Sequence, residues 1–219
     1  TVRRSRRIDF LFNNAGIGVG GEMDTYERED FDDVFDVNLR GVAYGIQAVY
    51  PIMIQQRSGH IINTASVAGL VASGGAGSYT ATKHAVVGLS KALRIEAHRH
   101  NVRVSALCPG AIRTPILTGG KYGRVRIDGA SKEAIMRQWE KTRPMDPAVF
   151  AKKVVERVLA NDPIIVVPGW WKAFWLLDRL SPSLSLYVWR RMQENLRRDM
   201  ERDGVSFDKK GSAEERARE

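Results

Sequence analysis

The sequence is poor in cysteine and contains no long apolar run. Its 219 residues include a single cysteine, Cys108, which cannot form a disulfide within the chain. This scarcity is typical of reducing compartments, and we therefore expect a cytoplasmic location. No stretch of about eighteen consecutive apolar residues occurs, so the sequence predicts no transmembrane helix. The core must come from ordinary packing of the hydrophobic residues, which make up 43% of the chain.

Metal-binding and nucleic-acid-binding patterns are missing as well. The four histidines and Cys108 do not have the spacing of a metal site, so no metal is predicted. The net charge of +9 could indicate nucleic acid, but the basic residues are scattered among acids. Neither zinc-finger spacing nor the aromatic and basic pattern of an RNA-binding sheet occurs. We therefore expect a basic, solvated surface and no nucleic-acid partner.

What the sequence does contain is an alternation of short apolar segments with longer segments of helical periodicity. Strands are expected at Ile8–Phe12, His60–Thr64, Val102–Leu107 and Ile164–Val167. Helices are expected at Phe31–Gln56 and Tyr79–His100, and near residues 132–141 and 147–161. This alternation implies parallel strands joined by right-handed crossovers. The predicted fold class is therefore α/β, with a Rossmann-type doubly wound parallel sheet.

The chain is expected to divide into three parts. Residues 1–169 would form a partial Rossmann-type catalytic domain, and residues 170–207 a helical extension rich in aromatic and basic side chains. Residues 208–219 are polar and are expected to form a disordered tail. Within the first part, residues 17–24 are expected to form a flexible Gly-rich loop, with Thr25 capping a short helical turn. Residues 113–145 are expected to be a loop that contains one helix.

Tyr79 and Lys83 form the first candidate for chemistry. Four positions apart on a helix, the two side chains lie on one face, one turn from each other. A free tyrosine titrates near pH ~10, whereas a fixed ammonium beside it favours the phenolate. The pair could therefore move an alcohol proton near neutral pH. The spacing alone is weak, because an ordinary solvent-facing helix pair has the same pattern.

Other polar groups follow predicted strand ends. Asn14, Ser66 and the pair Pro109-Gly110 each come just after such a strand. In an open parallel α/β sheet, the carboxyl ends of strands meet at one edge, where functional groups gather. Asn38 lies in an otherwise apolar helix and needs a hydrogen-bond partner. These residues are therefore expected near Tyr79.

The order and spacing of these elements resemble a known family over residues 8–168. The elements are Asn13-Asn14-Ala15-Gly16, Asn38, Ser66, Tyr79-x-x-x-Lys83 and Pro109-Gly110-x-x-x-Thr114. Together they resemble the short-chain dehydrogenase/reductase family. The resemblance implies an oxidoreductase that uses NAD or NADP to interconvert a small-molecule carbonyl and its alcohol. It also implies a homodimer or homotetramer built on the two long helices, whose small residues are Gly41, Gly45, Ala85, Gly88 and Ala92.

The resemblance assigns roles to particular residues. Tyr79 would donate or accept the proton, and Lys83 would lower the pKa of Tyr79 and bind the nicotinamide ribose. Ser66 would hydrogen-bond the substrate oxygen, and Asn38 would hold a water that relays protons to Lys83. Further cofactor contacts are implied at the strand ends: Asn14, Ala15 and Gly16 on the adenosine side, and Pro109, Gly110, Ile112 and Thr114 along the nicotinamide and diphosphate. The loop at residues 113–145 would shape the substrate pocket.

The chain departs from the family pattern before Ile8. Family members begin with a strand, a Gly-rich turn and a helix whose N-terminus holds the pyrophosphate. Gly16-x-Gly18-x-x-Gly21 matches the Gly-rich fingerprint, but no helix and second strand follow it in the required order. The sequence is therefore interpreted as N-terminally truncated, with its first strands missing and Ile8–Phe12 left as an exposed edge. The chain alone is expected to bind NAD(P) weakly or not at all.

The segment at residues 170–198 admits several readings. It combines Trp170, Trp171, Trp175 and Trp189 with several arginines. Aromatic side chains beside arginines suit peripheral contact with a membrane interface. A lid over the substrate pocket or a subunit contact also explains the pattern, and we favour these two. The alternatives to an active enzyme are a truncated, catalytically inactive fragment and a membrane-surface or scaffolding protein.

Overall fold

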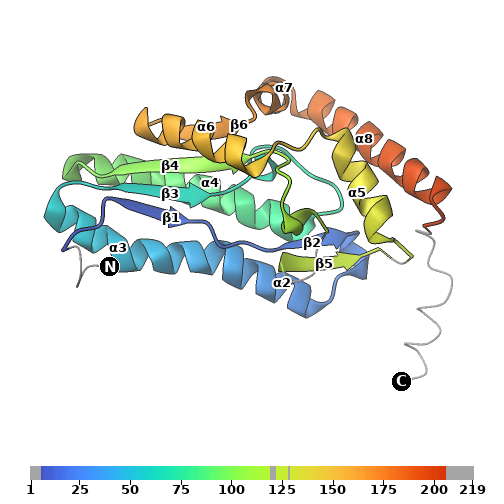
Figure 1. Cartoon of the computed structure of the whole chain (residues 1–219), viewed down its shortest axis with the longest axis horizontal. Helices are drawn as coiled ribbons and strands as arrows, with labels where there is room; N and C mark the ends of the chain where they lie inside the picture. The colour runs from blue at the N-terminus through green and yellow to red at the C-terminus, as the bar shows by residue number, and fades with distance from the viewer. Residues whose placement is uncertain (1–5, 119–121, 128, 206–219) are drawn as a thin grey trace.

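The computed structural model describes residues 6–118, 122–127 and 129–205. Its centre is a four-stranded, fully parallel sheet with the order β1-β3-β4-β6 (Figure 1). The strands are β1 (Phe10–Asn13), β3 (His60–Thr64), β4 (Arg103–Pro109) and β6 (Ile164–Val167). The predicted α/β class with a parallel sheet is confirmed, and each expected strand is present to within a few residues.

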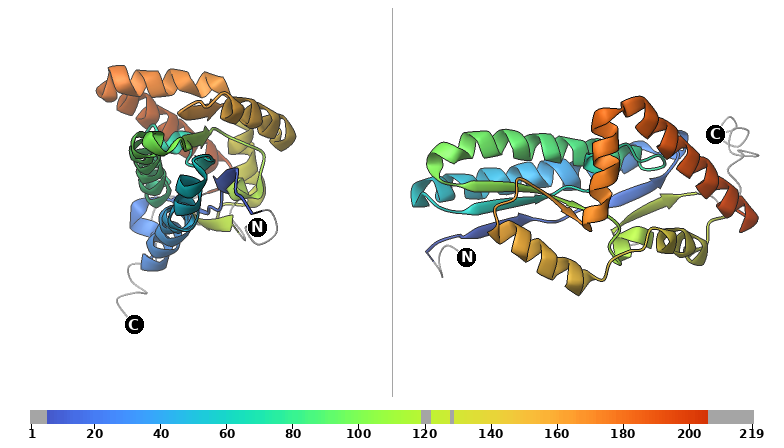
Figure 2. Two further views of the ribbon diagram at one scale, coloured as in Figure 1. Left: turned by 90° about the vertical axis from the view of Figure 1, so that its left-hand side faces the viewer. Right: turned by 90° about the horizontal axis from the view of Figure 1, so that it is seen from above.

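Helices cover both faces of this sheet. Successive side chains of a strand point to opposite faces, so Ile61 packs in one core cluster and Ile62 in another. Val104 joins the first cluster with residues of α3 (Gly41–Gln56) and α4 (Gly77–Ala97). Leu107 joins the second cluster with residues of α6 (Pro147–Leu159). Seen end-on, the sheet lies between these helices (Figure 2). The continuous apolar character of the strands follows from this burial on two sides.

The expected long helix Phe31–Gln56 is present but is not uniform. It comprises α2 (Arg28–Phe35), a π-helical segment η2 (Asp36–Arg40) and α3. Asn38 lies in the π-helical segment, and such segments often occur at functional sites. The expected cap at Thr25 was wrong. Thr25 ends the 3-10 turn η1 (Met23–Thr25), and Glu27 caps α2 through a capping box with Asp30.

The expected flexible loop at residues 17–24 was also wrong. Gly18–Gly21 forms strand β2, which pairs in parallel with β5 (Gly123–Arg126) in a separate two-stranded sheet. A Cβ on Gly123 would lie only 1.8 Å from the carbonyl oxygen of Gly18, so the close pairing requires glycine. The segment expected as loop and helix at residues 113–145 thus also contains a strand.

The remaining elements connect or extend the sheet. They are η3 (Val67–Gly69), η4 (His98–His100), η5 (Pro115–Thr118), α5 (Lys132–Lys141), η7 (Gly169–Trp171), α7 (Lys172–Leu180) and α8 (Pro182–Arg202). Phe174 of α7 packs against Trp171 and Trp189, with both ring centroids 5.5 Å away. This aromatic cluster attaches α7 and α8 to the core. The expected tail at residues 208–219 lies outside the described residues.

Strand β1 is at one edge of the four-stranded sheet, as the sequence predicted. Leu11 packs against the core, whereas Phe10 is 49% and Phe12 46% exposed. Alternation along the strand therefore places these two rings on a face that is only partly covered in the described part of the chain. Within that part, no helix is long and apolar enough to cross a membrane.

Candidate active site

The predicted site residues gather where the parallel strands end. Asn14 follows β1, and its Oδ1 accepts a hydrogen bond of 3.1 Å from the Thr64 hydroxyl at the end of β3. Ser66 follows β3, and its hydroxyl donates to the carbonyl oxygen of Pro109 at the end of β4, 3.4 Å away. The same Ser66 oxygen accepts from the backbone N–H of Ala68 at 3.1 Å and caps η3. Three loops are thereby linked at one edge of the sheet.

Tyr79 and Lys83 occupy the first turns of α4, which begins beside this edge. The Nζ of Lys83 lies 5.3 Å from the centroid of the Tyr79 ring. The same Nζ donates a 2.9 Å hydrogen bond to the carbonyl oxygen of Thr64. Lys83 is only 3% exposed, so its stem is enclosed by the core while its amine reaches the strand ends. The sequence prediction that both side chains share one face is met.

Burial dominates the electrostatics of this pair. It lowers the pKa of Lys83 to about 8, an effect that the nearby Cys108 thiol partly opposes. Burial also raises the pKa of the Tyr79 phenol, and a hydrogen bond with Ser66 acts in the opposite direction. The sequence analysis expected Lys83 to lower this pKa, and that role stays a prediction, because burial sets the net upward direction. In this structure the Lys83 amine bonds to the Thr64 carbonyl oxygen at the strand end.

Asn38 has a fully buried side chain that holds the loop after β1. Its Oδ1 accepts from the backbone N–H of Ile17 at 2.8 Å, and its Nδ2 donates to the Ile17 carbonyl oxygen at 2.9 Å. The Nδ2 also lies 3.4 Å from the Thr82 hydroxyl on α4. The partner that the sequence required for Asn38 is thus the backbone of Ile17. The side chain is occupied in positioning this loop.

The loop that carries Asn14, Ala15 and Gly16 runs over the amine of Lys83. A Cβ on Gly16 would lie 3.4 Å from both the Nζ of Lys83 and the Oδ1 of Asn38. A Cβ there would touch the amine at van der Waals distance, so glycine leaves this side of the amine more open. Asn14 and Ala15 are exposed on the same loop, where a ligand could reach them. The structure therefore brings Gly16, Asn38 and Lys83 together.

The residues expected on the nicotinamide side follow β4. The backbone N–H of Gly110 donates to the Val167 carbonyl oxygen at 2.9 Å. Ile112 is 7% exposed and forms a bridge with Met145, so its side chain has little surface to offer a ligand. Thr114 is partly exposed, and its hydroxyl donates to the Ile112 carbonyl oxygen at 3.4 Å. Of the four expected residues, Pro109, Gly110 and Thr114 are the better placed for contact.

Trp171 lies beside this site, and the sequence analysis did not identify its contact with Gly110, although it considered residues 170–198 as a lid over the substrate pocket. A Cβ on Gly110 would lie 2.1 Å from the Nε1 of Trp171, so the indole packs directly on the glycine backbone. This Nε1 is buried and has no hydrogen-bond partner among the described residues. The sequence contained only an indirect signal, namely a glycine that follows a buried strand.

A second missed feature is a buried chain of polar groups below the site. The Nδ2 of Asn13 donates to the Oδ1 of Asn63 at 2.8 Å, and the Nδ2 of Asn63 donates to the Ser90 hydroxyl at 3.0 Å. The chain links β1, β3 and α4. A Cβ on Gly45 would lie 2.1 Å from the Oδ1 of Asn13. The close approach that Gly45 permits within this chain is therefore made by Asn13.

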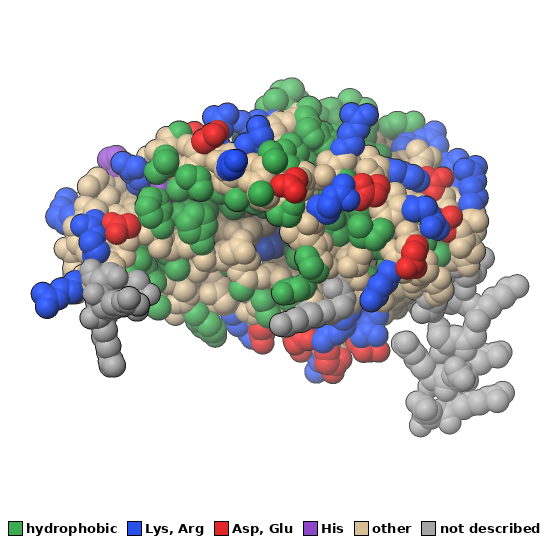
Figure 3. Space-filling view, in the orientation of Figure 1, with side chains coloured by type: hydrophobic (Ala, Val, Ile, Leu, Met, Phe, Trp, Pro, Cys, Tyr) green, Lys and Arg blue, Asp and Glu red, His purple; other side chains and the backbone are tan. Residues whose placement is uncertain are grey.

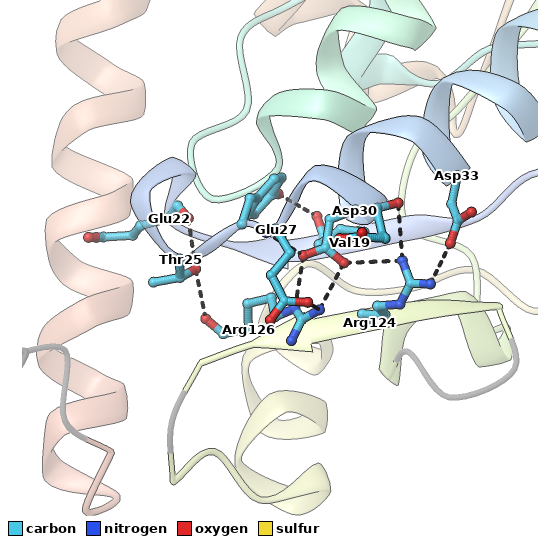
Figure 4. Close-up of polar contacts among 10 residues, drawn as sticks. Val19, Glu22, Thr25, Glu27, Asp30, Asp33, Arg124 and Arg126 are labelled. Atoms are coloured by element: carbon cyan, nitrogen blue, oxygen red, sulfur yellow. Dashed lines mark hydrogen bonds and ion pairs between the residues drawn. The ribbon is translucent and has the colours of Figure 1, made fainter. Parts of the chain in front are cut away.

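A third missed feature is an ion-pair cluster that attaches β5 to α2 (Figure 4). The carboxylate of Asp30 is fully buried and lies 3.1 Å from the Nη1 of Arg124 and 2.9 Å from the Nε of Arg126. Arg124 also pairs with Asp33, and Arg126 with Glu27. Burial alone raises the pKa of Asp30, but hydrogen bonds from Arg126, the Glu27 backbone and Arg124 outweigh it and hold this pKa below its usual value. The charged form of Asp30 thus fixes β5 against α2.

This cluster positions a strand that borders the candidate site. Arg124 and Arg126 hold β5, and β5 pairs with β2. A Cβ on Gly18 of β2 would lie 4.0 Å from the Tyr79 ring and 3.8 Å from Ile116. The small β2–β5 sheet therefore forms a wall beside Tyr79.

Comparison with known proteins defines the family. The sequence profile described as short chain dehydrogenase matches residues 1–121, which is more than half of the chain. The chain belongs to this family. Levodione reductase from Leifsonia aquatica is 44% identical over 118 residues, which cover 53% of this chain and 44% of that protein. The 3-oxoacyl-[acyl-carrier-protein] reductase of Thermotoga maritima is 43% identical over 115 residues, which cover 52% and 47%.

Solved structures support the same assignment. A short chain dehydrogenase/reductase from Burkholderia phymatum in complex with NAD has a TM-score of 0.70 and 30% identity, covering 84% of this chain and 69% of that one. The levodione reductase structure has a TM-score of 0.65 and 30% identity, covering 77% and 68%. The chain spans about half the length of the curated relatives that it matches. It is thus an oxidoreductase-family chain with a Rossmann-like α/β fold.

The site fits one end of a nicotinamide dinucleotide. Gly16 has no side chain, so the space next to the Lys83 amine, which a Cβ on Gly16 would fill, is open. The buried amine can therefore donate hydrogen bonds to ribose hydroxyls. Within residues 6–118, 122–127 and 129–205, no strand leads through a G-x-G-x-x-G turn into a helix, since Gly18–Gly21 is a strand. The same residues contain no group of His, Cys, Asp and Glu arranged to hold a metal ion.

Proposed function

We propose that this protein is an NAD(P)-dependent oxidoreductase that interconverts a carbonyl and an alcohol, with Tyr79 as its general acid and base. The observation that carries the proposal is the position of the Lys83 amine, 5.3 Å from the centre of the Tyr79 ring at the strand ends. Ser66, whose hydrogen bond influences the pKa of the same phenol, completes the group. A phenol, an ammonium and a hydroxyl together suit proton transfer to an oxygen atom.

The chemistry of each residue follows from its atoms. In the reducing direction, the Tyr79 hydroxyl gives its proton to the carbonyl oxygen while the carbonyl carbon receives a hydride. Ser66 donates a hydrogen bond to that oxygen and stabilises the developing charge. When bound, a nicotinamide cofactor supplies the hydride or accepts it in the reverse direction. The raised pKa of Tyr79 keeps the phenol protonated, which suits its role as proton donor.

Lys83 and the strand-end loops are proposed to hold the cofactor. The buried amine of Lys83 would donate to the nicotinamide ribose, and Gly16 keeps the approach to it open. The other parts of the cofactor near these loops would be contacted by Asn14, Ala15, Pro109, Gly110 and Thr114. Asn38 would act as a positioning residue because it fixes Ile17. The cofactor is proposed to be NAD or NADP, and the relative from Burkholderia phymatum was solved with NAD.

A cofactor-coupled assay tests the proposal. The protein as its gene encodes it is mixed with NADH or NADPH and a panel of carbonyl compounds that includes levodione and a 3-oxoacyl-[acyl-carrier-protein], the compounds that the relatives' names print. We expect oxidation of one cofactor with at least one ketone. Lys83→Met should abolish this oxidation and weaken cofactor binding.

The matched control is Lys91→Met, because Lys91 is an exposed lysine on the same helix. Its replacement should leave both rate and binding unchanged. The proposal is wrong if no ketone is reduced and no alcohol is oxidised with either cofactor, or if Lys83→Met behaves as Lys91→Met does.

A further inference from the structure

Helix α7 has an apolar stripe that faces away from the core. Its inner side chains pack in the core cluster, among them Phe174 and Trp175. The opposite face carries Ala173, Leu176, Leu177 and Leu180, which follow the i, i+3, i+4, i+7 spacing of a helix face. Leu176 is 54% and Leu180 84% exposed. The helix is thus apolar on both sides, and within the described residues only one of these sides packs against the core.

Helix α8, which follows α7 after a short turn, also carries exposed apolar side chains. Ser181 separates the two helices, and its hydroxyl accepts from the backbone N–H of Leu184 to cap α8. Leu184 is 49% exposed, and Tyr187, one turn further along the same face, is 46% exposed. We call Leu176, Leu180, Leu184 and Tyr187, together with the 46% exposed Trp170, the outer patch. In Figure 3, hydrophobic side chains gather along the edge that α7 occupies in Figure 1.

Basic side chains surround the outer patch. Residues 170–191 contain Lys172, Arg179, Arg190 and Arg191 but only one acid, Asp178. Arg190 and Arg191 both lie 5.5 Å from the Tyr187 ring, and Arg179 lies 5.9 Å from the Trp175 ring. The side chains of Arg190 and Arg191 are 67% and 57% exposed while they pair with Glu194. The patch therefore combines apolar surface, aromatic rings and an excess of positive charge.

We propose that the outer patch docks this protein on an anionic lipid surface. The leucines would enter the boundary between headgroups and acyl chains, and Trp170 and Tyr187 would lie at headgroup level. Lys172, Arg179, Arg190 and Arg191 would meet lipid phosphates. Helices α7 and α8 would then lie along the surface, and the protein would be anchored without spanning the bilayer.

Charge complementarity favours lipid over a second copy of the chain. A twofold contact through the outer patch would bring its basic residues toward the same basic residues of the partner. Like charges placed opposite each other oppose association, whereas an anionic bilayer supplies the missing negative charge.

The apolar stripe of α7 does not line the pocket beside α8, over which a lid could lie. The pocket of about 400 Å³ beside α8 is lined by Gly74, Trp189, Arg190 and Gln193 among others, and no residue of α7 contributes to it. The left view in Figure 2 shows α7 along the upper edge of the molecule, with the central sheet below it. Helix α8 can therefore border a pocket while α7 presents its leucines outward.

Vesicle co-sedimentation tests the proposal with the protein as its gene encodes it. One set of vesicles contains phosphatidylcholine alone, and the other contains phosphatidylcholine with phosphatidylserine. We expect binding to the anionic vesicles and much weaker binding to the neutral ones. The double variant Leu176→Gln, Leu180→Gln should reduce the partition coefficient by more than about tenfold because two apolar anchors are lost. Arg179→Gln should weaken binding to the vesicles that contain phosphatidylserine, and this loss should become smaller as the fraction of phosphatidylserine falls.

The matched control replaces two exposed apolar residues of α6, Val155 and Leu159, which are 51% and 62% exposed. Val155→Gln, Leu159→Gln should bind vesicles as the unaltered protein does, and circular dichroism should show that both double variants are folded. Two results overturn the proposal. One is binding that is absent or insensitive to the Leu176 and Leu180 changes. The other is a dimer in light scattering that the Leu176 and Leu180 changes convert to a monomer, without any vesicle binding.

Discussion

His60 is a buried histidine whose hydrogen bonds determine which ring nitrogen carries the hydrogen. Its Nε2 lies 2.8 Å from the Ser105 hydroxyl, and that hydroxyl donates its proton to the Asp162 carbonyl oxygen at 2.6 Å. The Nε2 must therefore donate to Ser105, so it carries the hydrogen. The Nδ1 is then the site of a further proton, and it is buried without a partner among the described residues. A charged imidazole is thus strongly disfavoured.

This arrangement predicts a loss of stability in mild acid. Burial, with smaller contributions from Arg103 and Arg94, lowers the pKa of His60 from 6.5 to about 4. Between these two pH values the unfolded chain binds more protons than the folded chain, so stability rises with pH. We expect the free energy of unfolding to fall as the pH is lowered from 6.5 to about 4. His60→Gln should flatten this part of the profile in urea titrations, and an unchanged slope in the variant would contradict the assignment.

At the scale of elements, the attachment of β5 to α2 depends on Asp30. Replacing Asp30 with Ala leaves Arg124 and Arg126 without their buried partner and removes the acceptor of the Glu27 backbone N–H. Loss of one partner of a buried ion pair typically costs 3–5 kcal/mol, and because both arginines are partly exposed we expect about 2 kcal/mol. Urea unfolding measures this cost. Activity should fall too, since β5 pairs with β2, and Gly18 of β2 lies beside the Tyr79 ring.

Asp36→Ala is the matched control for Asp30→Ala. Asp36 is an aspartate of the same continuous helix that pairs with Arg40, and both side chains are more than half exposed. Exposed pairs contribute little, so the expected change is below about 1 kcal/mol. Equal costs for the two variants would show that the cluster does not anchor β5.

The strands and long helices could be predicted because each is encoded locally. His60–Thr64 and Ile164–Val167 are apolar runs whose bounds match the structure, and the helical periodicity around Tyr79 is equally clear. Strand β2 could not be predicted, because its four residues are Gly-Val-Gly-Gly and its partner β5 lies far along the chain. Glycine is normally depleted in strands, and here only the close pairing explains it.

The site could be predicted in part for the same reason. Tyr79 and Lys83 lie on one helix, so their spacing alone places them together. Ser66 and Pro109 follow buried strands, and the convergence of parallel strand ends brings them to the same edge. The contact of Trp171 with Gly110 joins segments that are adjacent only after folding. The net rise in the pKa of Tyr79 depends on burial, which no local pattern reveals.

At the scale of the whole molecule, the exposed faces of α3 and α4 are candidates for subunit contact. We propose a homodimer or homotetramer through these helices. Ile95 on α4 is 79% exposed and Tyr44 on α3 63% exposed. Gly88 lies on the exposed face of α4, and a Cβ there would meet no atom of the described residues within 4 Å. The small residues of α4 thus leave room that a second copy could fill.

A single substitution tests this contact. Gly88→Arg should leave the monomer fold unchanged, because no described residue occupies the space, but it should block close helix packing between subunits. Light scattering should then give a monomer for Gly88→Arg and an oligomer for the unaltered protein. The control variant is Lys91→Arg, because Lys91 is exposed on the same helix, and this variant should stay oligomeric. A monomer for the unaltered protein would contradict the proposed assembly.

The central claim is that the Tyr79 hydroxyl carries the proton in a carbonyl–alcohol conversion, and removal of that one oxygen tests it most directly. The rate constant kcat and the cofactor Kd are measured for Tyr79→Phe and for Tyr44→Phe, whose exposed ring on α3 serves as the control. For Tyr79→Phe the account predicts a fall in kcat of about 10²–10⁴-fold with little change in Kd, because general acid–base groups contribute on that scale. Tyr44→Phe should behave as the unaltered protein. A Tyr79→Phe variant that keeps more than about a tenth of the original kcat would contradict the account.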